Sequence, residues 1–203
     1  MIIRPIHAHE IDTVAGMISA GYFCDKFFHW VVEDDADRLG VVAEYYKVYL
    51  RAAGCVSHVA EDADGTIVGA TVWLPDDVDA SIYDEINAVV GKYAPNFQAV
   101  ADASHDNEPD ERPFHQLVGF VVDERQRGRG IGAALLKFHL DVLDAQGIPT
   151  YLEASTPYHG GGVYGRFGYE MYSPVMTFAE GAILYPLWRG AITPHDSIVL
   201  DAN

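Results

Sequence analysis

The feature that most constrains this fold is a glycine-rich turn between an apolar segment and an amphipathic one. Residues 117–122 are apolar and predict a buried strand, while apolar residues recur from Ile131 to Leu140 with the spacing of one helix face. Between these segments Gly128, Gly130 and Gly132 carry no Cβ, so the backbone can adopt positive φ values and approach a ligand closely. The pattern therefore predicts a strand, a tight turn and a helix in direct succession.

The start of the predicted helix has the properties of an anion site. Its first N–H groups have no acceptor within the helix, and the helix dipole places partial positive charge at the same end. Arg125, Arg127 and Arg129 add three cations within five residues. We therefore interpret the turn as a cradle for a diphosphate.

Two other phosphate-binding motifs fit the turn less well. A P-loop needs a Gly-Lys-Ser/Thr ending, which is absent. The dinucleotide fingerprint is matched formally by Gly128, Gly130 and Ala133, but the charged or polar residues from Asp123 to Arg127 separate it from the strand. Only a single clear strand-helix unit follows it. A nicotinamide-dependent enzyme of the Rossmann type is therefore the third alternative.

Two motifs resemble those of the GNAT superfamily of N-acetyltransferases. Arg127-x-x-Gly130-x-Gly132, between a Val-rich strand and a helix, is similar to the acetyl-CoA motif of that family. Downstream, residues 151–155 are strand-like, and Val163-Tyr-Gly-Arg-Phe-Gly-Tyr169 resembles the family's Leu-Tyr-x-x-x-Gly-Phe. The two motifs follow in the family's order and spacing, and residues 152–157 are similar to puromycin-type acetyltransferases.

The resemblance implies an α+β fold in a single domain over residues 1–203. Its central sheet would be mixed, mostly antiparallel and twisted, with about seven strands, helices on its flanks and a splay between strands 4 and 5. Residue patterns predict the strands at 2–6, 55–60, 66–74, 117–122, 151–155, 169–178 and 183–188. They predict the helices at 9–20, 35–53, 82–92, 95–103 and from 131 onward. Residues 104–113 are expected to be an exposed loop, and residues 192–203 a polar tail.

Length and composition narrow the classes of protein to which this chain can belong. A chain of 203 residues with 49% hydrophobic residues suits one compact domain. No run of 18 apolar residues and no signal segment is present, so a cytoplasmic protein without a membrane partner is expected. Two cysteines are too few for a disulfide scaffold, and no Cys/His spacing predicts a metal site.

The charge is strongly acidic and uneven. Residues 1–113 hold 21 Asp and Glu against 7 Lys and Arg, and the whole chain has a net charge of -17. Nucleic acid is therefore disfavoured as a partner, since neutralising phosphates requires a basic face. An acidic surface attracts a cationic amine, although it also simply favours solubility. The sequence leaves open whether the protein forms a homodimer.

The resemblance also implies how acetyl-CoA, the cosubstrate, is held. Backbone groups of Phe120, Val121 and Val122 would pair with pantetheine, and an N–H group of this strand would polarise the thioester carbonyl. The diphosphate would lie on the glycine turn. The residues expected there are Arg127, Gly128, Arg129, Gly130, Ile131, Gly132 and Ala133.

Tyr164 occupies the tyrosine of the second motif, whose phenol protonates the leaving thiolate in the family. A phenol with a reference pKa of about 10 stays protonated at neutral pH and can donate to a thiolate of reference pKa about 8.5. The alternative is a structural tyrosine that only packs against the cofactor. The preceding loop, residues 156–162, departs from the family pattern, and His159 stands where relatives carry an Asn.

The general base is less defined. His115 lies beside Gln116, about where some relatives carry a catalytic Glu, and Glu153 lies within a predicted strand. Each has a structural alternative, which for Glu153 is an ion pair with Arg4 or Arg166. A further alternative is that no dedicated base exists and water carries the proton away.

The predicted function is transfer of an acetyl group from acetyl-CoA to a primary amine of a small molecule, by direct attack in a ternary complex. The alternative is a catalytically weak protein of the same fold that binds CoA or regulates. Residues 21–32 are rich in aromatics and either line the acceptor pocket or pack in the core. The residues concerned are Tyr22, Phe27, Phe28 and Trp30.

Overall fold

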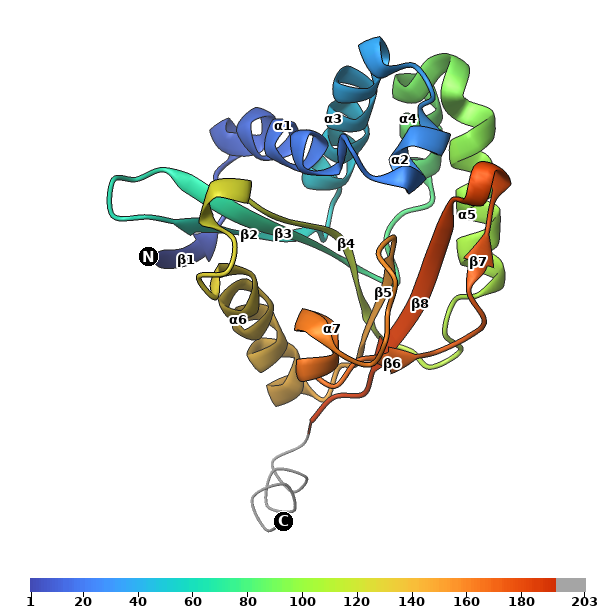
Figure 1. Cartoon of the computed structure of the whole chain (residues 1–203). Coiled ribbons are helices and arrows are strands. Elements are labelled where there is room, and N and C mark those ends of the chain that lie inside the picture. The colour runs from blue at the N-terminus through green and yellow to red at the C-terminus, as the bar shows by residue number, and fades with distance from the viewer. Residues whose placement is uncertain (193–203) are drawn as a thin grey trace.

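The computed structural model describes residues 1–192, which form a sheet with helices on both faces (Figure 1). The strands are β1 (Ile2–Pro5), β2 (Val56–Glu61), β3 (Ile67–Pro75), β4 (His115–Val122), β5 (Thr150–Ala154), β6 (Glu170–Met171), β7 (Met176–Thr177) and β8 (Ile183–Arg189). The α-helices are α1 (Ile11–Tyr22), α2 (Lys26–Val31), α3 (Asp35–Arg51), α4 (Ser81–Val90), α5 (Ala94–Asp106), α6 (Ile131–Gln146) and α7 (Gly162–Arg166). The predicted tail lies, from residue 193 onward, outside the described residues.

The sheet confirms the predicted mixed, mostly antiparallel architecture. Its strand order is β1-β2-β3-β4-β5-β8-β6, with β7 paired to β8 off this path, and the one parallel pair is β4 with β5. The described sheet has 8 strands where about seven were expected. The difference arises in residues 169–178, predicted as one strand, where Pro174 interrupts the segment and leaves two strands of two residues each.

The predicted splay lies between β4 and β5. These strands pair only through residues 115–117 and 150–152, and they separate beyond Leu117. At the same level the register of β3 with β4 shifts, so that Val72 faces Gly119 whereas Trp73 faces Leu117. Val118 is thus an extra residue in β4. A β-bulge of this kind bends its strand and increases the local twist, which opens a gap between β4 and β5.

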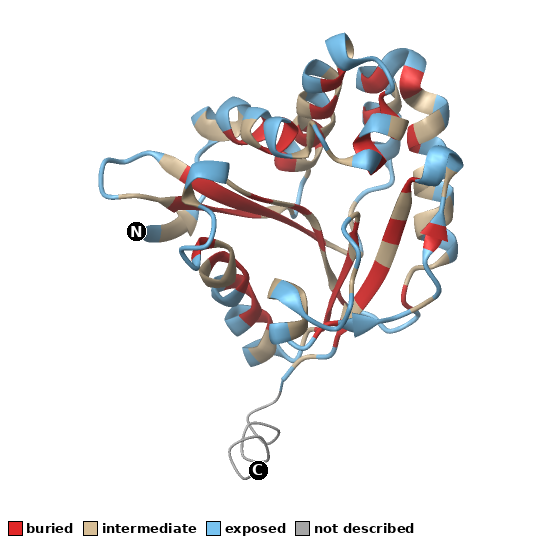
Figure 2. Ribbon diagram, in the orientation of Figure 1, coloured by how far each residue is buried: buried red, intermediate tan, exposed pale blue. Residues whose placement is uncertain are grey.

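Helices α1 to α5 cover one face of the sheet, and α6 and α7 cover the other (Figure 1). The two faces bury separate apolar clusters, and the central strands are buried from both sides (Figure 2). Helix α6 packs with the predicted face, which includes Ile131, Leu135 and Leu140. No helix of the described part combines the length and the apolar character needed to cross a membrane.

Two predicted boundaries were wrong for identifiable reasons. The segment predicted as a loop from residue 104 begins as helix, because α5 continues to Asp106. The helix predicted to end at residue 92 ends as α4 at Val90, where Gly91 adopts a φ of 57° that a continuing α-helix does not allow. The Asp-Gly hairpin between β2 and β3 is present, with Gly65 at a φ of 79°.

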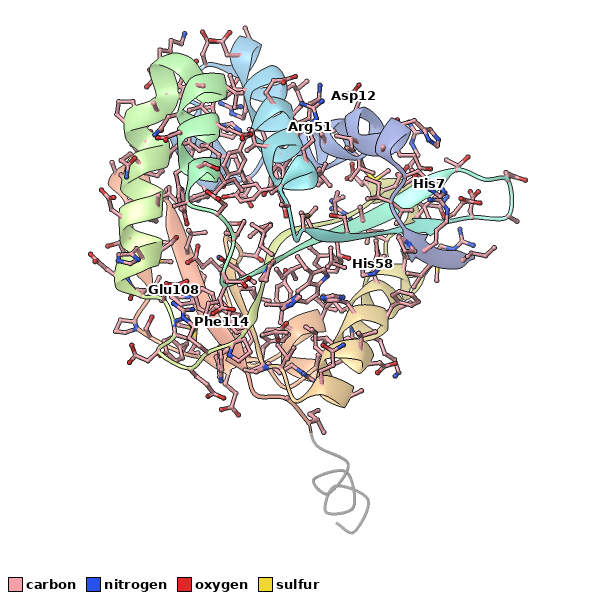
Figure 3. The ribbon with its side chains drawn as sticks, turned by 180° about the vertical axis from the view of Figure 1, so that it is seen from behind. His7, Asp12, Arg51, His58, Glu108 and Phe114 are labelled. Carbon is pink, nitrogen blue, oxygen red and sulfur yellow. The ribbon has the colours of Figure 1, made fainter. Side chains whose placement is uncertain are left out.

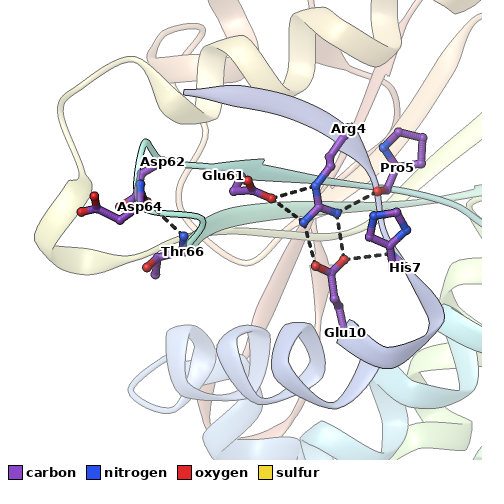
Figure 4. A network of polar contacts seen from close by, with 8 residues as sticks. All are labelled: Arg4, Pro5, His7, Glu10, Glu61, Asp62, Asp64 and Thr66. Atoms are coloured by element: carbon purple, nitrogen blue, oxygen red, sulfur yellow. Dashed lines mark hydrogen bonds and ion pairs between the residues drawn. The ribbon is translucent and has the colours of Figure 1, made fainter.

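Arg4 holds the edge of the sheet to the first helix (Figure 4). Its guanidinium donates to Glu10 at 2.7 and 2.9 Å and to Glu61 at 2.8 Å, joining β1, β2 and the segment before α1. Bidentate pairing of this kind is both strong and directional. Arg4 is therefore fully engaged, and the suggested ion pair of Arg4 with Glu153 is wrong.

Candidate active site

The start of α6 leaves a row of backbone N–H groups without acceptors. Gly130 is the N-cap with a φ of 80°, no side chain caps this end, and the first helical bond runs from Ala134 N to Gly130 O at 2.9 Å. Within residues 1–192, the N–H groups from Gly128 to Ala133 have no hydrogen-bond acceptor. Six successive free donors at a helix N-terminus form a strong anion site.

These N–H groups border a cavity of about 540 Å³ between the turn, β4 and α7. The volume is within the range of cofactor sites. Its walls come from the end of α1, from β4, from the glycine turn and from α7. The lining residues are Gly21, Tyr22, Phe120, Val121, Val122, Gln126, Arg127, Gly128, Gly130, Ile131, Gly132, Ala133, Val163 and Arg166.

Gly132 lets α6 approach β4 closely enough to form this cavity. A Cβ at Gly132 would lie 2.8 Å from Phe120 Cζ and 3.5 Å from Val122 Cγ2. The first distance is shorter than carbon atoms tolerate, so any larger residue would push the helix away from the strand. The glycine therefore sets the distance between the N–H donors and the strand.

The arginines of the turn differ in their positions. Arg127 lines the cavity, whereas the Arg129 side chain donates to the side chain of Gln126 and Arg125 is exposed. Arg166, on α7, also lines the cavity and was not predicted to bind the cofactor. Its position depends on the fold of residues 156–166, which the spacing of the second motif does not specify.

Two tyrosine hydroxyl groups occupy the edge of β4 that β5 leaves open. Tyr22 Oη accepts from Phe120 N at 3.1 Å and donates to Phe120 O at 3.0 Å. Tyr46 Oη donates to Val118 O at 3.0 Å. The backbone of Phe120, predicted to pair with pantetheine, is therefore already hydrogen-bonded in the free protein.

A second pocket of about 170 Å³ lies on the α1–α5 side of the sheet and shares Tyr22 with the first cavity. We call it the acceptor pocket. Its walls come mainly from α3, α4, α5, β4 and β5. Of the four aromatic residues weighed for this role, Tyr22, Phe27 and Phe28 line it. Trp30 does not, and instead stacks on Phe178 at 4.8 Å between ring centroids.

Glu153 lies in the wall of the acceptor pocket. Its carboxylate accepts from Ser104 Oγ at 2.8 Å and from Tyr151 Oη at 3.1 Å. Burial raises the pKa of Glu153 to about 7, against the lowering effect of these two hydrogen bonds. Glu108, which Figure 3 shows at the end of α5, is the other carboxylate of the pocket.

A polar contact that the sequence did not predict joins the helices to the end of β5. Ser155 Oγ donates to Asp25 Oδ2 at 2.6 Å, across 130 residues of sequence. Asp25 also caps α2, since its Oδ1 accepts from Phe27 N at 2.8 Å. Ser155 lines the acceptor pocket, so this pair is a further group that can accept or relay a proton there.

The structure places His115 away from both cavities. Its Nδ1 lies 3.3 Å from His139 Nε2 of α6, on the opposite face of the sheet from the acceptor pocket. His58, labelled in Figure 3, and Trp73 complete this cluster, with ring centroids 5.1 and 4.6 Å from that of His139. Burial lowers the pKa of His139 to about 3. His115 thus belongs to a buried histidine cluster, which its position in the sequence did not indicate.

The ring of Tyr164 packs between the side chains of Phe120 and Tyr169. Its ring centroid lies 6.0 Å from that of Phe120 and 5.9 Å from that of Tyr169. No hydrogen bond joins its hydroxyl group to another group of residues 1–192, and burial raises its pKa, with Tyr22 contributing. Its helix neighbours Val163 and Arg166 line the cofactor cavity, and Tyr164 packs beside Phe120, which also lines it.

The loop before α7 contains tight turns at its glycines. Gly160 and Gly162 adopt φ values of 73° and 70°, and a Cβ at Gly165 would lie 2.5 Å from Gly160 O. His159 is exposed and lines neither cavity. Among residues 1–192, no three His, Cys, Asp or Glu side chains are grouped as metal ligands.

Comparison with known proteins identifies the family. Residues 22–169 match the model of the acetyltransferase (GNAT) family, which covers most of the chain. The sequence matches none of the curated proteins with which it was compared.

Solved structures of acetyltransferases share the fold. One described as histone acetyltransferase HPA2 and related acetyltransferase, from Corynebacterium glutamicum, superposes with a TM-score of 0.71 at 19% identity, covering 95% of this chain and 97% of that one. Polyamine N-acetyltransferase of Drosophila melanogaster gives 0.65 at 14% identity, with 93% and 99% covered. Arylalkylamine N-acetyltransferase 2 of Aedes aegypti gives 0.61 at 13% identity, with 94% and 99% covered.

Proposed function

Because the chain belongs to the GNAT family of acetyltransferases, we propose that it transfers an acetyl group from acetyl-CoA to a primary amine of a small molecule. The observation that carries this proposal is the juxtaposition of two cavities at Tyr22. One presents six free N–H groups that suit a diphosphate, and the other is a small pocket that suits an amine. The structural neighbours that act on polyamines and arylalkylamines support an amine as acceptor.

The donor would lie in the 540 Å³ cavity with its diphosphate on the N–H groups from Gly128 to Ala133. Arg127 and Arg166 line the same cavity and supply charge-assisted hydrogen bonds to phosphate oxygens. Arg129 then contributes mainly through its backbone N–H. This arrangement needs no metal ion, since the helix dipole and the two guanidinium groups balance the phosphate charge.

In the proposed reaction, a neutral amine nitrogen attacks the thioester carbonyl carbon. A C–N bond forms, the C–S bond breaks and the thiolate of CoA leaves with the electron pair. The amine gives up its proton to a base, and the thiolate takes one from an acid. The N–H group of Phe120 would stabilise the carbonyl oxygen as it gains charge, which requires the Tyr22 hydroxyl to move aside.

The acid in this proposal is Tyr164, which holds the tyrosine position of the second motif and whose hydroxyl group has no hydrogen-bond partner among residues 1–192. For the base, Glu153 and the Ser155–Asp25 pair are the candidates next to the acceptor pocket. His115 is not proposed as the base, because it lies in the histidine cluster on the other face of the sheet.

The test is release of free CoA thiol from acetyl-CoA across a panel of primary amines, with Gly130→Asp as the key variant. Gly130 adopts a φ of 80°, and an aspartate there would place a carboxylate at the proposed diphosphate site. Gly147→Asp is a matched control, because Gly147 adopts a φ of 70° with equal space at the far end of α6.

We expect Gly130→Asp to lose acetyl-CoA binding and turnover by at least about 100-fold, whereas Gly147→Asp keeps both despite a similar backbone strain. Turnover that survives Gly130→Asp would refute the donor site. Acetyl-CoA binding without thiol release for any amine would instead favour a protein that binds CoA without catalysis.

A further inference from the structure

The acceptor pocket contains one carboxylate that no cation of the described residues neutralises. Within residues 1–192, the contacts of Glu153 are with two neutral donors, Ser104 and Tyr151. Removing a carboxylate from water without a positive partner costs several kcal/mol in general, and a cationic ligand recovers much of that cost. The side chain is thus arranged to meet a cation that the protein does not provide.

The other ionisable groups of the pocket do not provide Glu153 with a cationic partner. Glu108 pairs with Arg112, whose Nη2 lies 2.8 Å from Glu108 Oε2. His105 lies 4.0 Å from the same carboxylate and is largely exposed. None of the residues that line the pocket is Lys or Arg. Glu153 is therefore the carboxyl group of the pocket that has no cationic partner among the described residues.

The remaining walls favour a cation with a thin hydrocarbon body. Nine lining residues are Tyr or Phe, and the faces of such rings attract ammonium groups. The pocket volume of about 170 Å³ is close to that of a cavity of about 150 Å³ that holds one benzene molecule. A volume of this size suits the hydrocarbon body of a small amine.

The strand register places Glu153 some distance from the reacting end of the pocket. Leu152 of β5 and Leu117 of β4 are the last pair of these two strands, so Glu153 and Val118 are the first residues on either side of the splay. The Phe120 N–H, next to the donor cavity, lies two residues further along β4. Two residues of extended strand cover about 7 Å along β4. An extended chain of five or six bonds spans the same distance.

We propose that Glu153 binds the distal ammonium group of a short aliphatic diamine, whose other amino group reaches the donor cavity beside Tyr22. The proposal rests on the proposed acetyl transfer and names its acceptor as a diamine with four or five carbon atoms between the nitrogens. Glu153 is then a residue that determines specificity. The aromatic walls enclose the methylene chain between the two ends.

The test compares kcat/KM for 1,4-diaminobutane and 1,5-diaminopentane with butylamine, pentylamine and 2-phenylethylamine. We expect the diamines to be preferred over the matched monoamines by about 10- to 100-fold, the usual worth of a hydrogen-bonded charge pair. Glu153→Gln keeps the shape and the acceptor oxygen for Ser104 but removes the charge, and should lower the diamine value to that of the monoamine. Glu85→Gln, an exposed carboxylate on α4, is the control and should leave the preference intact.

Two outcomes would overturn the proposal. Preference for 2-phenylethylamine would assign the pocket to an aromatic monoamine. Loss of kcat by the same factor for diamine and monoamine in Glu153→Gln would make Glu153 the general base rather than an anchor. If no amine is acetylated at all, calorimetric titration with 1,4-diaminobutane still tests the anchor, because binding must be lost in Glu153→Gln and kept in Glu85→Gln.

Discussion

Tyr164 and Tyr22 are neighbouring half-buried tyrosines whose hydroxyl groups have different surroundings. That of Tyr164 has no partner among residues 1–192, as suits a group that donates a proton to a leaving thiolate. We expect Tyr164→Phe to lower kcat by about 100-fold, the lower end of what a positioned acid contributes, with little change in the Kd for acetyl-CoA. Assays of free CoA thiol release from pH 6 to 9 measure this change in kcat. Unchanged turnover over that range would leave Tyr164 with a packing role only.

Tyr22 blocks the Phe120 N–H group that the thioester carbonyl would use. Tyr22→Phe removes a hydroxyl that bonds both Phe120 N and Phe120 O, so the free protein should lose about 1–3 kcal/mol of stability. Acetyl-CoA should bind about 5- to 10-fold more tightly, because it no longer displaces the hydroxyl. Calorimetric titration and thermal unfolding report both effects.

Tyr93→Phe is the matched control for this experiment, since Tyr93 bonds Asp37 at 2.9 Å and lines neither cavity. It should lower stability without changing the affinity for acetyl-CoA. Weaker donor binding in Tyr22→Phe than in the unaltered protein would mean that this hydroxyl assists the donor instead of competing with it.

At the scale of elements, the distance between α6 and β4 decides whether the N–H donors face a usable cavity. Gly132→Ala introduces a Cβ 2.8 Å from Phe120 Cζ, and overpacking of this kind costs about 1–3 kcal/mol. We expect a lower Tm and weaker acetyl-CoA binding together, since the helix start must shift. Gly40→Ala in α3, where a Cβ meets nothing within 4 Å, should instead raise stability by about 0.5–1 kcal/mol. Equal Tm changes in the two variants would contradict this account.

At the scale of the whole molecule, buried histidines make stability depend on pH. Burial lowers the pKa of His58, His115 and His139, the last to about 3 from 6.5. Below pH 6.5 the unfolded chain binds more protons than the folded one, so the free energy of unfolding falls as pH falls. Glu153, with a pKa raised to about 7, acts in the opposite direction.

Replacing one histidine isolates its contribution from that of Glu153. The unaltered protein should lose stability as pH falls, because His139 is held neutral in the folded state, whereas His139→Leu lacks this contribution. We therefore expect the free energy of unfolding of the variant, relative to that of the unaltered protein, to rise by about 1.4 kcal/mol for each pH unit from pH 6 down to pH 4. Urea unfolding at several pH values measures it. A difference independent of pH would show that His139 is not held neutral in the folded protein.

The parts of the fold that were predicted correctly depend on neighbours in sequence. The passage from β4 through the turn to α6 follows from an apolar run, three glycines and a helical repeat, all within 25 residues of Leu117. The Asp-Gly hairpin and the start of α3 are similar cases. Errors occurred where contacts between residues far apart in the sequence set the end of an element. One example is the end of α5, where Ser104 forms a hydrogen bond with Glu153 of β5.

The acceptor pocket could not be predicted in the same way. Tyr45, Tyr46 and Tyr49 have the spacing of a core-facing helix stripe, and nothing local distinguishes a stripe that fills a core from one that borders a pocket. His115 and Glu153 were both plausible bases. Only the β4–β5 register and the alternation of side chains along each strand send one toward α6 and the other into the pocket.

The sequence by itself determined the glycine turn at the start of α6, the mostly antiparallel α+β sheet and the family, because glycine conformations, helix N-terminal N–H groups and hydrophobic periods are local properties of the chain. The tertiary structure alone decided that Tyr22 closes the edge of β4 and that Glu153 meets Ser104 inside a tyrosine-lined pocket. These contacts join residues 98 and 49 positions apart. They exist only because the bulge at Val118 parts β4 from β5 and helices from the first half of the chain pack over the gap.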